Sequence, residues 1–244
     1  MLGIILAGGQ SQRFGGANAI PKPLVRVSGA PLVLHAAGKL IDAGATRIVV
    51  LTGTTHDLIR SGLQIQADSG ILVVGDKHAA FQIRFSGKDA GTAGRLAALD
   101  ADEIGDEALL SYTDVFTDAE LERLLRSRRA SGSALTLLTA PARHPWGVVT
   151  TQGEQVVAFS EKPVDPVLRI NAGFFAIGKA ILDHLHDASE MLESGPVQRM
   201  ITAGQVSAVH HPGRWVSVDS PKDLPALVAS GLIRADRVPR LMGT

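Results

Sequence analysis

Short apolar runs, separated by polar and glycine-rich stretches, dominate the first part of the chain. Leu2–Ala7, Arg47–Thr52 and Ala108–Tyr112 are such runs, and each is followed closely by glycine or by a threonine–aspartate pair. Runs of this length are typical of strands that are buried on both faces. Between them, apolar residues at helical spacing predict helices at 31–43 and from Asp118, as the cap, to about residue 129.

The rest of the chain continues this alternation with shorter elements. Further strands are predicted at 71–74, 134–139, 147–150, 156–160, 171–177, 206–210 and 215–218, and helices at 55–61, 91–101, 179–186, 197–203 and, capped by Ser220, from 221. The segment 75–90 predicts no element. Apolar strands that alternate with helices favour an α/β fold, in which helices cover both faces of a largely parallel sheet.

The pattern changes after residue 140 without a flexible linker. We therefore expect one domain, 1–244, with a first half at 1–140, a second half at 141–230 and a C-terminal tail at 231–244, in which residues 234–244 are loosely held. Lys+Arg and Asp+Glu both total 24, which argues against a general nucleic-acid or membrane-surface binder. Cysteine is absent, so thiol nucleophiles, disulfides and cysteine-built metal sites are excluded. With no long apolar stretch, we expect a soluble cytoplasmic protein.

The first candidate for chemistry is the loop after the first strand. Gly8 and Gly9 let main-chain N–H groups approach a phosphate or a base without a Cβ in the way. Arg13 and Lys22 could then close around a triphosphate. The alternative is a tight turn with two solvated basic residues. The loop matches neither the P-loop nor the dinucleotide-binding fingerprint.

Acidic residues at later strand ends are the second candidate. Asp114 follows the predicted strand at 108–112, where open α/β sheets bind ligands, and it could hold Mg²⁺ on phosphate oxygens. Its alternative is a turn or capping aspartate. Glu161-Lys162, Asn171 and Asp219 are each ordinary surface or capping residues when taken singly. Their order along the chain is what makes them informative.

In this order the motifs resemble the sugar-1-phosphate nucleotidyltransferases. LAGG…R…PKP (6–23), YTD (112–114), EKP (161–163), NAGFF (171–175), HPGRW (211–215) and VDSPKDL (218–224) are similar to that family's blocks. DAGTAGRL (89–96) is similar to a segment of glucose-1-phosphate cytidylyltransferases. The resemblance implies a single-domain, Rossmann-like, three-layer fold with a mixed, mostly parallel central sheet. It also implies transfer of a nucleotidyl group from an NTP to a sugar 1-phosphate, with release of pyrophosphate.

The resemblance also implies a role for each matched residue. Arg13 and Lys22 would be catalytic; Leu6, Ala7, Gly8, Gly9, Gln10, Thr92 and Gly94 would bind the nucleotide; Glu161, Lys162 and Asn171 would bind the sugar phosphate; and Asp114 and Asp219 would bind Mg²⁺. The implied partners are the NTP and the sugar 1-phosphate, without nucleic acid or membrane, and a homo-oligomer is compatible with the family.

Some positions depart from the family pattern. Ser11 and Gln12 replace a glycine and a threonine of the glycine-rich loop, and Thr113 replaces the glycine before the metal-binding aspartate. CTP with a hexose 1-phosphate is the first expectation, and GTP with a heptose or cyclitol 1-phosphate is the alternative. A glycosyltransferase is disfavoured because no Asp-x-Asp motif surrounds Asp114. A non-catalytic nucleotide-binding relative is disfavoured because the charged residues are retained.

Overall fold

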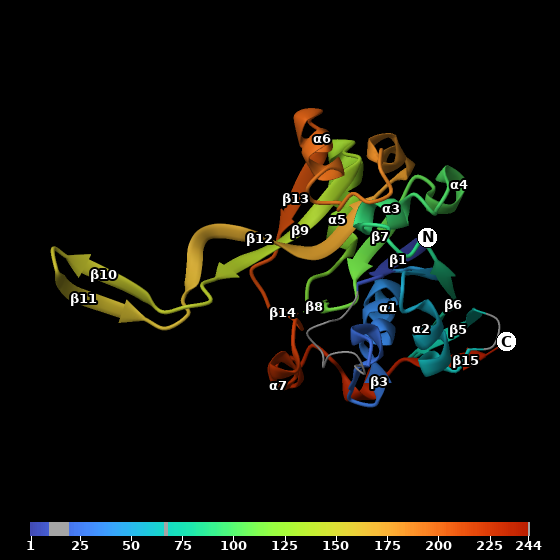
Figure 1. Ribbon diagram of the computed structural model, residues 1–244, viewed down its shortest axis with the longest axis horizontal. Helices are drawn as coiled ribbons and strands as arrows, with labels where there is room; N and C mark the ends of the chain where they lie inside the picture. Colours follow the sequence, from blue (N-terminus) through green and yellow to red (C-terminus); the bar gives the residue numbers. More distant parts are fainter. Residues whose placement is uncertain (10–19, 66–67, 244) are drawn as a thin grey trace.

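The computed structural model describes residues 1–9, 20–65 and 68–243. These residues form one α/β domain around a nine-stranded sheet in the order β13–β9–β12–β7–β1–β4–β6–β5–β15 (Figure 1). The strands are β1 (Leu2–Ala7), β4 (Arg47–Thr52), β5 (Ser69–Val74), β6 (Lys77–Phe85), β7 (Ala108–Tyr112), β9 (Leu135–Arg143), β12 (Val164–Ile177), β13 (Val206–His210) and β15 (Arg240–Gly243). The central strands β7, β1, β4 and β6 run parallel, whereas β12, β5 and β15 are antiparallel to their neighbours. This confirms a mixed sheet with a parallel centre.

Strand β1 shows why its sequence is apolar at every position. Successive side chains of a strand point to opposite faces of the sheet, and both faces are covered here. Ile5 is fully buried in the hydrophobic core on one face, and Ile4 is fully buried in the core on the other. Burying such a side chain contributes about 1.5–3 kcal/mol relative to leaving it exposed.

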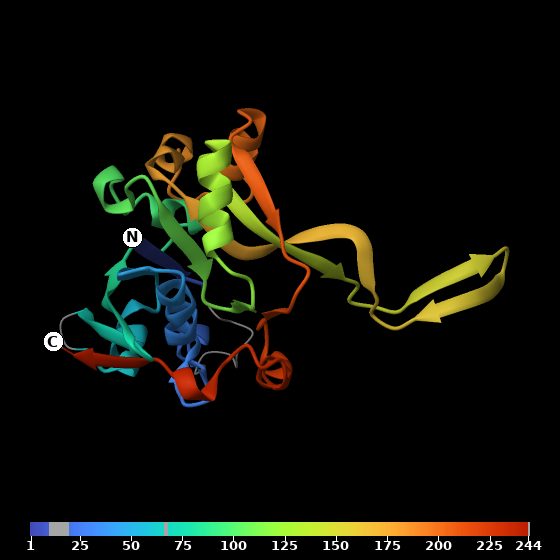
Figure 2. The ribbon, with the colours of Figure 1, turned by 180° about the vertical axis from the view of Figure 1, so that it is seen from behind.

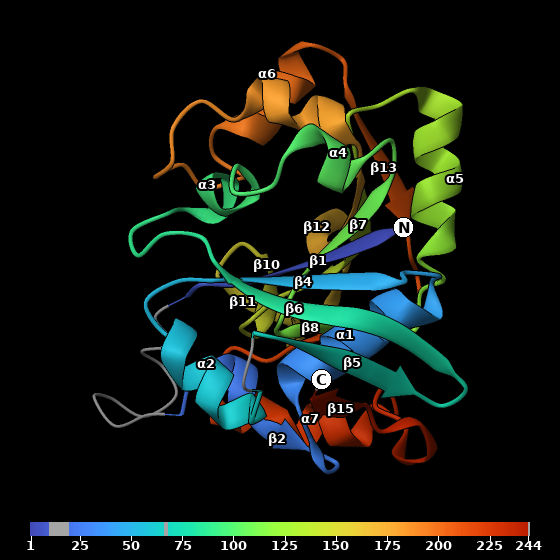
Figure 3. The same ribbon diagram turned by 90° about the vertical axis from the view of Figure 1, so that its right-hand side faces the viewer.

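Helices cover both faces of the sheet and complete the three layers (Figure 3). The core that contains Ile5 receives residues from α1 (Leu32–Asp42), α2 (His56–Leu63) and α5 (Glu122–Ser131). The core that contains Ile4 receives residues from α3 (Thr92–Leu96), α4 (Ala101–Ile104), the 3-10 helix η4 (Lys179–His184) and α6 (Pro196–Thr202). Leu227 of α7 (Leu224–Ala229) lies in a third, smaller cluster with Phe116 and Val218.

Shorter elements connect these layers. They are the 3-10 helices η3 (Lys22–Leu24), η5 (Pro221–Asp223) and η6 (Ala235–Arg237), and the short strands β2 (Arg26–Val27), β3 (Ala30–Pro31), β8 (Val115–Thr117) and β14 (Trp215–Ser217). Among the described residues, no helix combines the length and the apolar character needed to cross a bilayer.

Strand β6 lies in the segment for which the sequence predicts no element. Its buried residues Ala79, Phe81 and Ile83 alternate with exposed or half-buried ones, most of them polar, and pack into the core that contains Ile5. On the polar side, Arg84 Nη2 lies 2.6 Å from Glu103 Oε1 in an ion pair. A central strand with polar residues on one side lacks the continuous apolar run by which such strands are recognised in a sequence.

Two further predictions need correction. The helix predicted at 91–101 is broken, because Asp100 caps a new helical turn by accepting the N–H of Glu103 at 2.8 Å. The described part of the tail segment expected to be loosely held, residues 234–243, is held in place, since β15 pairs with β5 at the edge of the sheet. Arg237 also forms an ion pair of 2.8 Å with Asp42. Both differences arise from contacts with specific partner residues, and the spacing of apolar residues along the chain does not reveal such contacts.

A long two-stranded extension leaves the body of the molecule (Figures 1 and 2). It consists of the far ends of β9 and β12 and of the hairpin β10 (Val148–Gln152) and β11 (Gln155–Ser160) between them. We call residues 143–170 the arm. Every residue of β10 and β11 is exposed, so the hairpin contributes nothing to the core of its own chain.

Candidate functional site

The loops that follow β1 and β7 lie at the same edge of the sheet. The two strands are parallel neighbours, and Leu6 near the end of β1 is paired with Tyr112 at the end of β7. Gly8 and Gly9 follow the first strand, and Thr113 and Asp114 follow the second. Ligands of open α/β sheets bind outside the carboxyl ends of the parallel strands. The two predicted loops therefore meet where a ligand is expected.

Three of the predicted site residues come together at this edge. Lys22, the first residue of η3, places its Nζ 2.8 Å from Asp114 Oδ2 and 3.7 Å from Asp219 Oδ1. The side chains of Lys22 and Asp114 are mostly buried, and that of Asp219 is 60% exposed. We refer to these three residues as the charged cluster. It joins the beginning, the middle and the end of the chain.

Backbone pairing holds the two acids in place. Asp114 precedes β8, Asp219 follows β14, and the two strands pair antiparallel with Val115 opposite Ser217. Beyond this ribbon, the Asp219 N–H donates to Asp223 Oδ2 at 2.9 Å. Asp223 also accepts the N–H of Ser220, which begins the helical turn as the sequence predicts. The positions of both carboxylates therefore follow from main-chain register.

The charged cluster fits a magnesium ion that substrate phosphates complete. Two carboxylate oxygens from separate strands already converge on one positive charge, the Lys22 ammonium. Mg²⁺ is usually held by one or two carboxylates together with water and phosphate oxygens, rather than by a complete protein cage. No group of three or more His, Cys, Asp or Glu side chains in the described part of the chain could hold a metal by itself. The two carboxylates of the charged cluster therefore suit a Mg²⁺ ion that binds together with the substrate phosphates.

A buried arginine supports the glycine loop, and the sequence analysis assigned it no role. Arg95 of α3 donates hydrogen bonds to the carbonyl oxygens of Gly8 at 3.1 Å, Thr52 at 2.9 Å and Gly87 at 3.0 Å. A Cβ on Gly8 would lie 1.9 Å from Arg95 Cζ, whereas a Cβ on Gly9 would have no neighbour within 4 Å. Burial lowers the pKa of Arg95. The sequence gives one indication of this role: Arg95 is the only charged residue in the short segment that forms α3.

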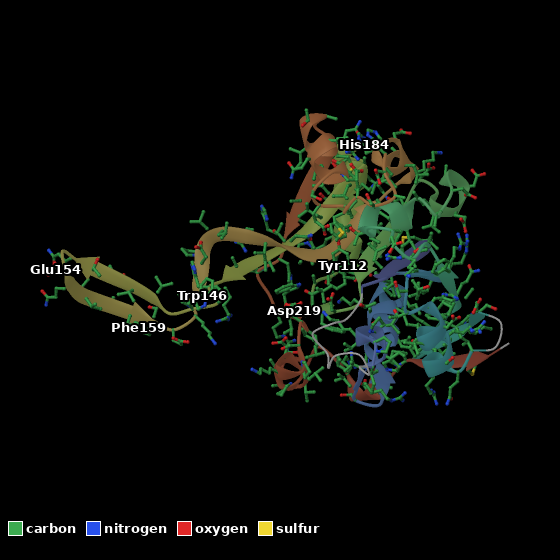
Figure 4. All side chains as sticks on the ribbon, viewed as in Figure 1. Tyr112, Trp146, Glu154, Phe159, His184 and Asp219 are labelled. Carbon is green, nitrogen blue, oxygen red and sulfur yellow. The ribbon has the colours of Figure 1, made fainter. Side chains whose placement is uncertain are left out.

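Tyr112 is a second residue without a role in the sequence analysis. Its hydroxyl donates to the Glu193 carboxylate, and its ring stands edge-on to Phe175 at a centroid distance of 5.9 Å. Burial, followed by the nearby Glu193 charge, raises the pKa of the phenol. Figure 4 labels Tyr112 on the body, on the same side as Asp219. In the sequence, the only indication of a role for Tyr112 is its position at the end of a predicted strand.

The predicted nucleotide-binding residues occupy several environments. Leu6 and Ala7 are buried within β1. The Thr92 hydroxyl accepts the N–H of Leu192 at 2.7 Å. A Cβ on Gly94 would lie 1.8 Å from the Ala188 carbonyl oxygen, so close packing of α3 requires this glycine. Gln10 and Arg13, like Ser11 and Gln12, lie outside the described residues.

The predicted sugar-phosphate residues lie on β12 and on the arm. Asn171 is exposed, and its Oδ1 accepts the N–H of Gly173 at 2.9 Å. Glu161 and Lys162 follow the hairpin, and the Lys162 carbonyl accepts from Arg143 Nη1 at 3.2 Å. Within the described chain, no hydrogen bond or ion pair joins Glu161 or Lys162 to Asp114 or Asp219. The structure thus gathers the cluster but leaves this Glu–Lys pair on the arm.

Asp118 does not cap the helix that follows it, which corrects the sequence-based prediction. Helix α5 begins at Glu122, and Asp118 Oδ1 instead lies 2.6 Å from His211 Nε2 and accepts the Arg214 N–H at 2.9 Å. Burial raises the pKa of Asp118, but the hydrogen bonds from Arg214 and His211 outweigh it and leave the pKa lowered. Asp118 therefore anchors the chain just before β14.

Known proteins share this architecture. The chain is 28% identical over 239 residues to a probable glucose-1-phosphate cytidylyltransferase of Bacillus subtilis, covering 92% of this chain and 93% of that protein. It is 28% identical over 233 residues to the mannose-1-phosphate guanylyltransferase catalytic subunit beta of Xenopus tropicalis, covering 91% of this chain and 62% of that protein. A crystal structure of a putative glucose-1-phosphate thymidylyltransferase from Bacillus anthracis superposes with a TM-score of 0.69 at 20% identity, covering 94% of each chain. The family model described as nucleotidyl transferase matches residues 2–224, and the chain therefore belongs to that family.

Proposed function

We propose that this protein transfers a nucleotidyl group from an NTP to a sugar 1-phosphate and releases pyrophosphate. The observation that carries the proposal is the charged cluster at the carboxyl ends of β1 and β7. Its position, its charges and the membership of the nucleotidyl transferase family all support this reaction. The relatives named above are sugar-1-phosphate nucleotidyltransferases that differ in their base.

In the proposed reaction, a phosphate oxygen of the sugar 1-phosphate attacks the α-phosphorus of the NTP. A new P–O bond forms while the bond from the α-phosphorus to the bridging oxygen breaks, and pyrophosphate leaves with that electron pair. The attacking phosphate is already an anion at neutral pH, so no activated serine or histidine is required. The protein has to position two anions that repel each other and to neutralise the charge that develops.

The residues divide this work. Lys22 neutralises the α-phosphate, and Arg13 binds the departing β- and γ-phosphates. Asp114 and Asp219 hold Mg²⁺, which supplies positive charge to the phosphate oxygens when bound. Main-chain groups of Gly8 and Gly9, which follow β1, approach the nucleotide. These assignments rest on the family blocks and on the convergence of the charged cluster.

On the sugar side, Lys162 binds the phosphate, Glu161 accepts hydrogen bonds from sugar hydroxyls, and the amide of Asn171 accepts or donates them. CTP is the preferred nucleotide in this proposal because the segment 89–96 is similar to that of cytidylyltransferases. GTP is the second candidate, and the guanylyltransferase relative favours it. Base choice depends on a few contacts, so it can change while the reaction is retained.

Pyrophosphate release tests the proposal directly. Purified protein with Mg²⁺ is mixed with each of the four NTPs and with glucose, mannose and heptose 1-phosphates. One NTP, CTP by preference, should release pyrophosphate with one of these sugars. The variant Lys22→Met should lose about 10²–10³-fold in rate, the typical cost of removing a preorganised charge contact. The matched control Lys77→Met removes an exposed lysine at the start of β6 and should retain the wild-type rate.

Two results would contradict the proposal. The first is no pyrophosphate release in any combination by protein that is folded and binds nucleotide. The second is equal rates for Lys22→Met and Lys77→Met, which would leave the charged cluster without a function in the reaction.

A further inference from the structure

The C-terminal tail closes one wall of an open cavity on the side of the body away from the arm. The cavity has a volume of about 800 Å³ and lies between the β2–β3 hairpin, the end of α2, and β15. Figures 1 and 3 show α2 and β15 together on this part of the body. Sites for small molecules usually have volumes of about 300–1,000 Å³. We call this space the tail cavity.

The wall of the tail cavity is apolar except for a few polar groups. Leu34 of α1 and Leu241 of β15 are among its apolar residues. Arg26 of β2 and Arg240 of β15 are the only charged residues among the described residues that line it. The tail cavity therefore has two positive charges and no negative charge on its wall. Lys22, Asp114 and Asp219 do not line it, so it is separate from the charged cluster.

No carboxylate neutralises these two arginines within the described chain. Arg26 Nη2 donates to the carbonyl oxygen of Gly29 at 2.5 Å, and the guanidinium of Arg240 makes no hydrogen bond to any described residue. Arg237, only three residues before Arg240, does form an ion pair with Asp42. Guanidinium groups that lack a carboxylate partner beside an apolar wall favour a ligand with an anionic part and an apolar part.

A phosphate ester has both of these parts. Its phosphate carries up to two negative charges at neutral pH, and guanidinium groups bind its oxygens in pairs. Its organic part can pack against the apolar wall, and a planar ring can also stack on a guanidinium. An inorganic anion leaves the apolar wall in water, whereas an uncharged molecule leaves both arginines without a counter-charge.

The tail cavity adjoins the segment that carries Lys22. Arg26 follows Lys22 by four residues, and the 3-10 helix η3 lies between them. On the other side of η3, Leu24 packs against Gly62 of the cavity wall, where a Cβ would lie 2.5 Å from Leu24 Cδ1. A ligand that contacts Arg26 and Gly62 therefore touches the structure on both sides of η3.

We propose that the tail cavity binds a small organic phosphate, and that its occupation changes the affinity of the charged cluster for an NTP. Five residues of its wall lie beyond residue 224, where the match to the nucleotidyl transferase family model ends. The wall thus depends on a segment that the family model does not include. Binding of the phosphate is independent of the function proposed above, whereas the coupling to the NTP rests on that function.

Calorimetric titration with 1-naphthyl phosphate, without nucleotide, tests the binding. The double variant Arg26→Gln/Arg240→Gln removes both charges, and both side chains are exposed, so its melting temperature should match that of wild type. It should raise the Kd of the probe about tenfold or more, since charge-assisted hydrogen bonds are lost. The control Arg126→Gln removes an exposed arginine of α5 that does not line the cavity, and it should keep the wild-type Kd.

Two comparison ligands and one further variant locate the probe. Inorganic phosphate and 1-naphthol should each bind more weakly than 1-naphthyl phosphate, because each lacks one of the two parts. The probe should still bind to Lys22→Met, in which the charged cluster has lost its cation. Equal Kd values for wild type and the double variant would overturn the proposal, as would loss of binding in Lys22→Met. Inorganic phosphate that binds as tightly as the probe would show that no organic ligand is recognised.

A second titration tests the coupling without turnover. CTP and GTP are titrated in the absence of sugar phosphate, with and without saturating 1-naphthyl phosphate. Coupling between two sites typically changes affinity by about 5–150-fold, so the probe should change the Kd of the bound nucleotide by at least about fivefold. The nucleotide should change the Kd of the probe by the same factor, and the double variant should show neither effect.

The possible failures are distinguishable. A nucleotide Kd that stays the same when the probe is bound overturns the coupling. If neither CTP nor GTP binds, the function proposed above is refuted and the coupling with it. The titration of the probe alone then still decides whether the tail cavity binds an organic phosphate.

Discussion

The main-chain N–H of Val218 donates a hydrogen bond of 2.8 Å to the carbonyl oxygen of Asp114, directly beyond the last pair of the β8–β14 ribbon. This bond links the segment that carries one acid of the charged cluster to the segment that carries the other. The link uses backbone atoms alone. Either carboxylate can therefore be removed while the register that positions its neighbour is retained.

The first prediction concerns the two acids. Asp114→Ala and Asp219→Ala should each reduce the single-turnover rate by about 10²–10³-fold, because each removes a charge that organises the phosphates. The rates are measured across a Mg²⁺ titration. Asp76→Ala, an exposed acid in the turn between β5 and β6, should retain the wild-type rate. Near-parental rates for both cluster variants at every Mg²⁺ concentration would show that neither acid holds the metal.

The second prediction compares the two adjacent glycines of the first loop. Gly8→Ala should lower the melting temperature, because its Cβ would lie 1.9 Å from Arg95 Cζ and must displace the guanidinium. Gly9→Ala meets no atom within 4 Å and should keep the wild-type melting temperature. If Gly9 approaches the nucleotide, Gly9→Ala should still raise the KM for NTP. Equal melting temperatures for the two variants would contradict the packing argument.

The third prediction concerns Arg95. Arg95→Met should destabilise the fold, since it leaves the partly buried carbonyl oxygens of Gly8 and Gly87 without this donor, at about 1–3 kcal/mol for each unsatisfied group. The Thr52 carbonyl loses one donor but still accepts from the N–H and the hydroxyl of Ser86. Urea unfolding gives the free energy of unfolding. Arg95→Lys restores a charge but not the fork of donors, so it should recover only part of the loss. Recovery of full stability by lysine would mean that charge alone matters.

The fourth prediction uses the fact that Tyr112 is the single tyrosine of the chain. Its raised pKa means that the folded state retains the phenolic proton after the unfolded state has lost it at about pH 10. Absorbance at 295 nm should therefore show no tyrosinate in folded protein at pH 10.5 and a normal titration in guanidinium chloride. Tyr112's contribution to stability is complete below about pH 10 and falls as the pH rises further. Tyrosinate in native protein near pH 10 would refute the burial.

The fifth prediction concerns Asp118. Its lowered pKa means that its contribution to stability is present above the ordinary aspartate pKa of about 3.9 and is lost as the pH falls through the folded value. Asp118→Asn should therefore unfold more easily than wild type at pH 7, and the difference between the two should shrink below about pH 4. A difference that does not depend on pH would point to shape rather than charge as the role of this side chain.

The pattern of apolar residues within a segment predicts those parts of the fold that depend on neighbours along the chain. Strands β1, β4 and β7 were predicted with their observed bounds, because strands buried on both faces need apolar residues throughout. Strand β6 was missed because its buried residues alternate with exposed ones, so it contains no continuous apolar run. Strand β15 was missed because its pairing with β5 depends on a distant edge. Asp118 was misassigned because its partners, His211 and Arg214, lie far along the chain.

The sequence by itself determined the family, the α/β class, the buried central strands and the set of charged residues from which a phosphate site can be built. Only the tertiary structure decided that Lys22, Asp114 and Asp219 meet, that Arg95 and Tyr112 support the same edge of the sheet, and that Glu161 and Lys162 lie on the arm. The physical reason is that apolar periodicity is a local property. Contacts between distant residues follow instead from strand register and from which surfaces find a partner.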